Sequence, residues 1–515
     1  MIRSGRPSYL GATFVAGLLV LTACSASSNT TTRTTHPRAT TTTRTPASTT
    51  SESTTSTSST TLPADQLLKW IDCDDGFQCA QLDVPIDYRV PTEGSITLAL
   101  ARRPATNPSK RIGSLVMNPG GPGGSAIDFI EGTPLPAELT ERFDVVGFDP
   151  RGVGRSSPLN CRTHLRAIYD ADPTMEDDAD RAAYLRVSKA FVDECAKKYK
   201  ALLPFLGTVN VARDMDQVRA ALGDDKLTYL GYSYGTSIGQ QYARLFPTKV
   251  RAMVLDGVVD SSLTGVQGAA LQAKGFTRAL DNFVAECDRS ACGLPGPAAD
   301  VINEVRAAAE IAPIPARRAD RPAGPGAVEL ALGQALRSET LWPELARALS
   351  QGASGNGNAI AQLADAYLER HPDGTYPNGF EIYFAVGCLD STWPKDPKVV
   401  FDAAKLVGAL YPQFGEAAVN DFVRCALWPV TPQPLKPLDS AVKGLPPVVV
   451  ISTTGDPATP YESGFKVADQ IPTGVLVTNK GEGHTVFGSG KPCIDDAVTL
   501  YLVGLTPPPT GLVCS

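Results

Sequence analysis

The amino-acid sequence predicts an α/β protein in which a mostly parallel sheet is flanked by helices and interrupted by an inserted, mainly helical lid domain. Two observations predict this fold class. Short apolar runs alternate with segments of helical periodicity, which is typical of a parallel sheet covered by helices. An Ala-rich region of helical pattern, residues 262–440, then breaks the alternation before apolar runs resume.

The expected elements follow this alternation along the chain. Strands are expected at 96–101, 113–117, 143–148, 227–230, 252–256, 447–452 and 475–477, and helices at 180–198, 211–221 and 236–246. The core is therefore assigned to residues 63–261 and 441–515, and residues 262–440 form the lid between its two parts. The lid is expected to cover the site. It could admit long acyl chains, or it could narrow the cleft so that only the end of a substrate chain enters.

Ser233 is the candidate nucleophile. It stands in Gly-Tyr-Ser-Tyr-Gly, residues 231–235, between the strand pattern at 227–230 and the helical pattern at 236–246. In that setting G-x-S-x-G predicts a nucleophile elbow, a sharp turn that lifts the hydroxyl above the sheet edge. The pentapeptide alone is a weak signal, and an ordinary Gly-bounded turn is the alternative.

His484 is the candidate general base among only four histidines. His36 lies in a Thr/Ser-rich tract, His164 near a polar stretch, and His371 opens a turn-like segment. His484 follows the apolar run 475–477, which places it on a loop at a strand's carboxyl end.

Asp456 is the candidate third member, because α/β-hydrolases carry their triad in the order Ser, Asp or Glu, His. It follows the buried strand pattern at 447–452, where an acid can orient the imidazole and stabilise its cation. A simple turn-forming role is the alternative, since Gly-Asp-Pro is good turn chemistry. Thr459 is close enough in sequence to help shape the site.

A Gly-rich loop at 118–125 is the candidate source of oxyanion donors. Its glycines let backbone N–H groups approach a ligand without obstruction by side chains. We expect one donor from Gly121 and the other from Tyr234, the residue after the nucleophile. Phosphate binding is disfavoured because the loop has neither G-x-G-x-x-G nor the P-loop pattern.

The first 23 residues are predicted to be a signal peptide, and Leu-Thr-Ala-Cys at 21–24 resembles a bacterial lipobox in which Cys24 is lipidated. Residues 24–62 are Thr/Ser-rich and predict a disordered tether. We therefore expect a protein anchored to the extracytoplasmic face of the cell membrane. An ordinary secretory signal, with an incidental Cys24, is the alternative.

The eleven cysteines support export, because ten remain for pairing once Cys24 is set aside. Pairing neighbours in sequence is the simplest of many connectivities: Cys73–Cys79, Cys161–Cys195, Cys287–Cys292, Cys388–Cys425 and Cys493–Cys514. Structural zinc is disfavoured because no C-x-x-C pair occurs. We expect no metal and no cofactor.

Composition disfavours a nucleic-acid partner. The formal net charge is −7 and the pI is near 5.3, so the chain has no basic excess to neutralise phosphates. The oligomeric state is not determined by the sequence, and we favour a monomer.

The motifs together resemble one family from about residue 65 to the end. They are similar to those of secreted or lipid-anchored α/β-hydrolase peptidases of actinobacteria, the tripeptidyl aminopeptidase relatives of prolyl aminopeptidases. The matching segments are 118–125, 143–152, 231–235, 456–460 and 483–485. One departure is Pro119, which stands where prolyl aminopeptidases have the His of His-Gly-Gly-Pro-Gly, so only backbone donors are retained.

The resemblance implies release of short peptides from the free amino end of a peptide or protein substrate. Ser233 would be acylated, His484 would carry the proton and Asp456 would orient the imidazole. An aminopeptidase also needs a carboxylate for the substrate ammonium, and Asp390 is our candidate, although a solvated lid aspartate is as good an interpretation. An esterase or lipase with the same triad remains open, as does a binding lipoprotein without turnover.

Overall fold

The computed structural model describes residues 68–515 except 74–75, 176 and 318. The predictions for the signal peptide, Cys24, the tether and His36 lie outside the described residues. No helix in the described part is long and apolar enough to span a bilayer.

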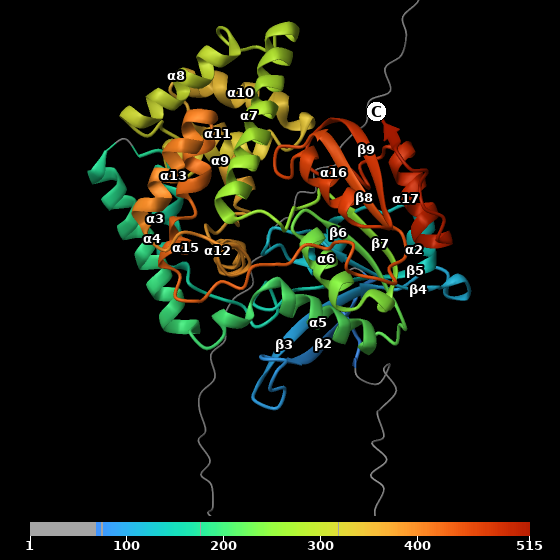
Figure 1. Ribbon diagram of the computed structural model, residues 1–515. Helices are drawn as coiled ribbons and strands as arrows, with labels where there is room; N and C mark the ends of the chain where they lie inside the picture. The colour runs from blue at the N-terminus through green and yellow to red at the C-terminus, as the bar shows by residue number, and fades with distance from the viewer. Residues whose placement is uncertain (1–67, 74–75, 176, 318) are drawn as a thin grey trace, which may run out of the picture. The chain divides into compact units, whose positions relative to one another are not determined.

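The described strands form one sheet in the order β1-β2-β3-β5-β4-β6-β7-β8-β9-β10 (Figure 1). Their bounds are β1 Ile71–Asp72, β2 Gln78–Pro85, β3 Ser95–Arg103, β4 Gly113–Asn118, β5 Phe143–Phe148, β6 Leu227–Tyr232, β7 Val250–Asp256, β8 Val448–Gly455, β9 Gly474–Glu482 and β10 Leu512–Cys514. Pairing is antiparallel from β1 through β3 to β5 and parallel from β5 onward. The predicted α/β-hydrolase fold, with its mostly parallel sheet, is confirmed.

Helices cover both faces of the sheet, which explains why β4, β5 and β6 consist entirely of buried residues. Alternate residues of β4 enter different cores. Val116 packs in the core that contains α5 (Thr208–Ala221) and α6 (Gly235–Leu245). Leu115 and Met117 pack in the other, with α1 (Ala126–Gly132), α2 (Ala137–Arg142) and α17 (Pro492–Gly504).

The lid lies between β7 and β8 in the chain and is helical, as expected. Its helices are α7 Gly265–Ser290, α8 Ala298–Ile311, α9 Pro325–Ala335, α10 Trp342–Ala353, α11 Asn358–Tyr367, α12 Gly379–Asp390, α13 Pro397–Leu410, α14 Gly415–Asn420 and α15 Val423–Leu427. They gather to one side of the sheet in Figure 1.

Two helices assigned to the first core part join the lid in space. These are α3 (Leu165–Tyr169) and α4 (Asp178–Tyr199). The Tyr184 hydroxyl of α4 donates to Asp421 at 2.9 Å, and Arg424 of α15 donates to Tyr184 at 3.3 Å. The helical layer around the lid is therefore built from two separate segments of the chain, namely α3 with α4 and the lid itself.

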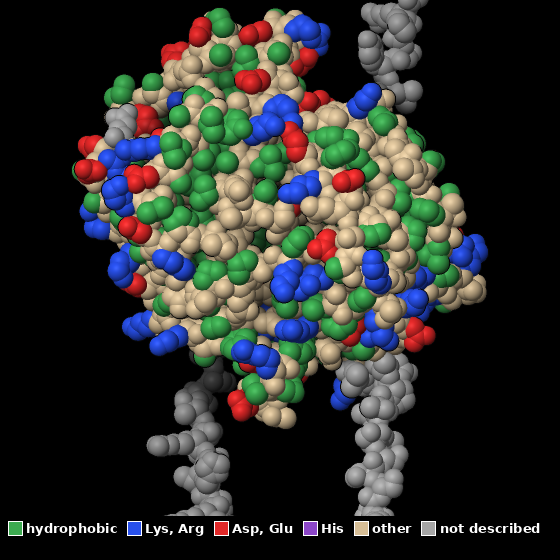
Figure 2. Space-filling view, in the orientation of Figure 1, with side chains coloured by type: hydrophobic (Ala, Val, Ile, Leu, Met, Phe, Trp, Pro, Cys, Tyr) green, Lys and Arg blue, Asp and Glu red, His purple; other side chains and the backbone are tan. Residues whose placement is uncertain are grey.

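All five predicted disulfides are present in the structure. On the face shown in Figure 2, Lys and Arg side chains are interspersed with acidic, apolar and uncharged surface. Among the described residues, no group of three or more His, Cys, Asp or Glu side chains is placed to hold a metal ion.

Candidate active site

Ser233 occupies the sharp turn between β6 and α6. Its φ is 53°, a left-handed conformation that is costly for a residue with a side chain. The turn depends on the flanking glycines: a Cβ at Gly231 would lie 2.6 Å from the Gly235 carbonyl oxygen, and one at Gly235 would lie 2.7 Å from the Asn118 carbonyl oxygen. The local structure is thus that of the predicted elbow.

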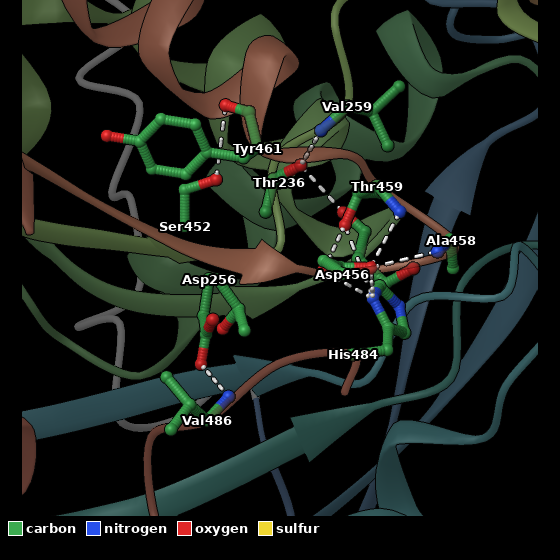
Figure 3. Close-up of polar contacts among 12 residues, drawn as sticks. Thr236, Asp256, Val259, Ser452, Asp456, Ala458, Thr459, Tyr461, His484 and Val486 are labelled. Carbon is green, nitrogen blue, oxygen red and sulfur yellow. Dashed lines mark hydrogen bonds and ion pairs between the residues drawn. The ribbon is translucent and has the colours of Figure 1, made fainter. Parts of the chain in front are cut away.

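Asp456 and His484 form a hydrogen-bonded pair at the carboxyl ends of β8 and β9 (Figure 3). His484 Nδ1 lies 3.0 and 2.9 Å from the two carboxylate oxygens of Asp456. Asp456 is fully buried, and backbone N–H groups of Ala458 and Thr459 each donate to its Oδ1 at 2.9 Å. These contacts fix the carboxylate so that it can orient the ring and stabilise an imidazolium.

Thr459 belongs to the same cluster, as the sequence suggested. Its hydroxyl donates to Asp456 Oδ2 at 2.9 Å and lies 3.2 Å from His484 Nδ1 (Figure 3). One side chain therefore contacts both the acid and the base. Its role in turnover stays a prediction.

Asp256, the last residue of β7, and Gly257 after it lie next to the nucleophile turn and the base, respectively. The Ser233 N–H donates to the Asp256 carbonyl at 2.9 Å. A Cβ at Gly257 would lie 3.1 Å from His484 Cε1. The elbow thus contacts one of two consecutive residues and the imidazole lies beside the other, although no hydrogen bond joins the Ser233 hydroxyl to the ring among the described contacts. Such bonds are often long before substrate binds.

The loop after β4 lies directly against the elbow. A Cβ at Gly120 would meet Tyr234 N at 2.8 Å and Ser233 Cβ at 2.9 Å. The Gly120 N–H donates to Asn118 Oδ1 at 3.0 Å, whereas the N–H groups of Gly121 and Tyr234 have no acceptor among the described residues. Tyr234 follows Ser233 and Gly121 follows the glycine that contacts the elbow, and the role of their N–H groups as an oxyanion hole stays a prediction.

The lid contacts the loops that carry both the acid and the base. The His484 N–H donates to the Arg337 carbonyl at 2.8 Å. From α7, Gln272 donates to the Ala458 carbonyl at 3.0 Å and Arg278 donates to the Asp456 carbonyl at 3.2 Å. The lid is therefore part of the framework that holds the site.

Asp390, at the end of α12, is 9% exposed, and both of its carboxylate oxygens accept hydrogen bonds from Thr208. The Thr208 hydroxyl is also 2.6 Å from the Tyr234 hydroxyl. Burial raises the pKa of Asp390 to about 7, although the hydrogen bonds from Thr208 lower it. The structure thus links this lid carboxyl to the residue after the nucleophile, and ammonium binding by Asp390 stays a prediction.

Three functional contacts were missed from the sequence: those of Asp256, Thr208 and Arg337. Asp256 had a usable signal, because it is an acid at the carboxyl end of a strand next to the elbow strand. Thr208 had only its place at the start of a helix. Arg337 contributes a backbone carbonyl, which no side-chain pattern reveals.

Two family models match the chain. The first, described as alpha/beta hydrolase fold, matches residues 113–294 and so includes the elbow. The second, described as TAP-like protein, matches residues 411–514 and so includes Asp456 and His484.

Curated relatives match most of the chain. Serine protease Hip1 of Mycobacterium tuberculosis is 41% identical over 467 residues, covering 85% of this chain and 87% of the relative. Carboxylesterase B of the same species is 39% identical over 457 residues, covering 85% and 86%. Tripeptidyl aminopeptidase of Streptomyces lividans is 33% identical over 466 residues, covering 85% and 84%.

Proposed function

Because the chain belongs to the family of TAP-like α/β-hydrolases, we propose that it is a serine aminopeptidase that releases short peptides from the free amino end of a peptide or protein substrate. The observation that carries the proposal is the hydrogen-bonded Asp456–His484 pair beside the Ser233 elbow. The names of two relatives, a serine protease and a tripeptidyl aminopeptidase, support a peptide substrate.

In the proposed reaction, Ser233 Oγ attacks the scissile carbonyl carbon while His484 takes the hydroxyl proton. Asp456 accepts from Nδ1–H and stabilises the imidazolium. The N–H groups of Gly121 and Tyr234 donate to the oxyanion. The imidazolium then protonates the leaving amine, and water, deprotonated by His484, hydrolyses the acyl-enzyme.

Carboxylesterase activity is the second candidate, because one relative of similar identity carries that name. Ester cleavage uses the same nucleophile and base. It differs in the leaving group, since an alkoxide departs more readily than an amine and depends less on protonation by the imidazolium.

We further propose that the protein is exported and held at the extracytoplasmic face of the cell membrane by a lipid on Cys24. The lipobox-like residues 21–24 and the Thr/Ser-rich tract after them support this proposal. Partition into a detergent phase tests it: the native protein should enter that phase and a Cys24→Ala variant should not. Aqueous partition of both would contradict it.

The central experiment compares the purified protein with Ser233→Ala on tripeptide amides with free and blocked amino ends, and on short-chain and long-chain esters. The aminopeptidase proposal predicts Ser233-dependent cleavage that prefers free-amine amides. Ester turnover without amide turnover would favour the carboxylesterase. Equal activity of the Ser233→Ala variant would remove Ser233 from the mechanism.

The same substrates test the ammonium site. If Asp390 binds the substrate ammonium, Asp390→Asn should lose the preference for free over blocked amino ends. An equal loss on both substrates would instead show that Asp390 acts through Thr208 and Tyr234.

A further inference from the structure

Asp256, the last residue of β7, holds the loop that follows the candidate base. Its carboxylate Oδ2 accepts the backbone N–H of Val486 at 2.8 Å (Figure 3) and that of Phe487 at 2.8 Å. These are the second and third residues after His484. Its own backbone carbonyl accepts the Ser233 N–H at 2.9 Å. One residue therefore contacts both the nucleophile turn and the histidine loop.

The histidine loop is held from both ends. On the amino side, the His484 N–H donates to the Arg337 carbonyl, and on the carboxyl side the Asp256 carboxylate accepts two N–H groups. Between these contacts Thr485 has a φ of 64°, which a non-glycine residue keeps only when the surroundings impose it. Release of the Asp256 contact would allow this segment to relax and the imidazole to move.

We propose that Asp256 is a positioning residue for hydrolysis at Ser233, which fixes the His484 loop through its carboxylate and supplies a second negative charge near the imidazole. This inference rests on the proposed function. It differs from the role of Asp456, because Asp256 contacts the loop backbone and not the ring nitrogen.

The surroundings of Asp256 support a charge effect. The carboxyl is fully buried, and its Oδ1 has no hydrogen-bond partner among the described residues. Burial raises the pKa of Asp256 to about 6, although the two N–H groups and His484 lower it, and Asp456 raises it further. The Tyr232 hydroxyl donates to the Phe487 carbonyl at 3.3 Å, and Asp495 of α17 accepts the Gly488 N–H at 2.9 Å. Among these neighbours of Asp256, His484 is the side chain whose positive charge would favour the ionised carboxylate.

The variants Asp256→Asn and Asp256→Ala separate charge from position. Asparagine keeps an oxygen that can accept both N–H groups and removes the charge, whereas alanine removes both. Asp224→Asn is the matched control: its Oδ2 accepts the Ser114 N–H at 3.0 Å at the opposite end of the sheet, just before β6.

A fluorophosphonate probe gives a readout that needs no natural substrate. The Ser233 Oγ–P bond forms, the P–F bond breaks, the hydroxyl proton passes to His484 and fluoride leaves. The second-order labelling rate is measured from pH 4 to pH 9, with the melting temperature of each variant.

The labelling rate should fall on the acid side of the pH profile. Asp256→Asn should move the midpoint of this acid limb down by about half a pH unit or more, because one negative charge that favours the imidazolium is removed. Asp256→Ala should label about 100-fold more slowly at pH 8 than the native protein. Asp224→Asn should change neither the midpoint nor the rate.

An unchanged midpoint in Asp256→Asn would overturn the proposal, even if its melting temperature falls, because a purely structural contact does not move the acid limb. Near-native labelling by a folded Asp256→Ala would also overturn it. If Asp256→Ala does not fold, Asp256→Asn alone decides. Failure of the proposed function gives a different result from failure of this inference. If Ser233 is not the nucleophile, the native protein and Ser233→Ala would label equally. If the protein is not a peptidase, the native protein would label but cleave only esters.

Discussion

The backbone N–H of His484 donates to the carbonyl of Arg337, 2.8 Å away, so a residue of the lid holds the candidate base. Arg337 is the second residue after α9, and His484 is the second residue after β9. The imidazole is therefore placed jointly by the sheet and by the lid. A change at this contact should affect chemistry at Ser233 although it touches neither Ser233 nor Asp456.

Gly483→Ala tests this contact. The φ of Gly483 is 101°, and an added Cβ would lie 3.1 Å from the Arg337 carbonyl oxygen, so the two segments must separate. We expect fluorophosphonate labelling of Ser233 to fall about tenfold or more, since small displacements of a base are costly. Gly490→Ala is the control, because its φ of 82° is also left-handed but nothing lies within 4 Å of the added Cβ. Equal losses in both variants would attribute the effect to backbone strain alone.

Gly120→Ala tests the proposed oxyanion donors. The new Cβ would lie 2.6 Å from the Tyr232 carbonyl oxygen and 2.8 Å from Tyr234 N, so the loop must move away from the elbow. Loss of one oxyanion donor typically lowers kcat about 100-fold to 1000-fold, and we expect a loss of that size. Gly223→Ala, at a φ of 79° with open space around it, should retain activity. Near-native turnover by Gly120→Ala would argue against this loop as the donor.

Thr459→Val removes the hydroxyl that donates to Asp456 while keeping the side-chain shape. A hydrogen bond to a carboxylate contributes about 1.5–3 kcal/mol, so we expect kcat/KM to fall about tenfold or more. Thr459→Ser keeps the hydroxyl and should remain within about threefold of the native protein on the same amide substrate. If the serine variant is as slow as the valine variant, packing of the methyl group is responsible rather than the hydroxyl.

Asp390→Asn should change how stability depends on pH. Because the folded-state pKa of Asp390 is raised to about 7, above the unfolded value of about 3.9, the folded protein binds a proton that the unfolded chain does not. The resulting stabilisation is present below about pH 4 and is lost as the pH rises through 7. Between pH 4 and pH 8 the melting temperature of the native protein should therefore fall more than that of Asp390→Asn. Parallel curves for the two proteins would show that Asp390 titrates normally.

Much of the sheet was predictable because strands covered on both faces leave continuous apolar runs. The strand at 143–148 was predicted with its observed bounds, and β4 and β7 were predicted within a few residues. β2 was missed because this strand near the sheet edge mixes polar and apolar residues, and β10 because it has only three residues. The extension of β9 beyond residue 477 was missed because Asn479 and Lys480 end its apolar run.

The candidate site was predictable where a side chain follows a strand, and not where distant segments meet. Ser233, Asp456 and His484 each had such a position. Because the chain has only four histidines, few candidates for the general base had to be considered. The contacts of Asp390 with Thr208 join residues far apart in the chain, so the sequence did not reveal them, and ammonium binding by Asp390 stays a prediction. The hydrogen bond between His484 and Arg337 uses only backbone atoms and therefore leaves no trace in residue types.

The position of β8 and β9 near the end of the chain has a consequence during synthesis. The ribosome makes the elbow and the lid before it makes Asp456 and His484, so a nascent chain that stops anywhere between β7 and β8 contains Ser233 without Asp456 or His484. Such fragments have the hydroxyl at its ordinary, weak nucleophilicity. Translation products interrupted in this region should therefore be inert toward the peptides around them.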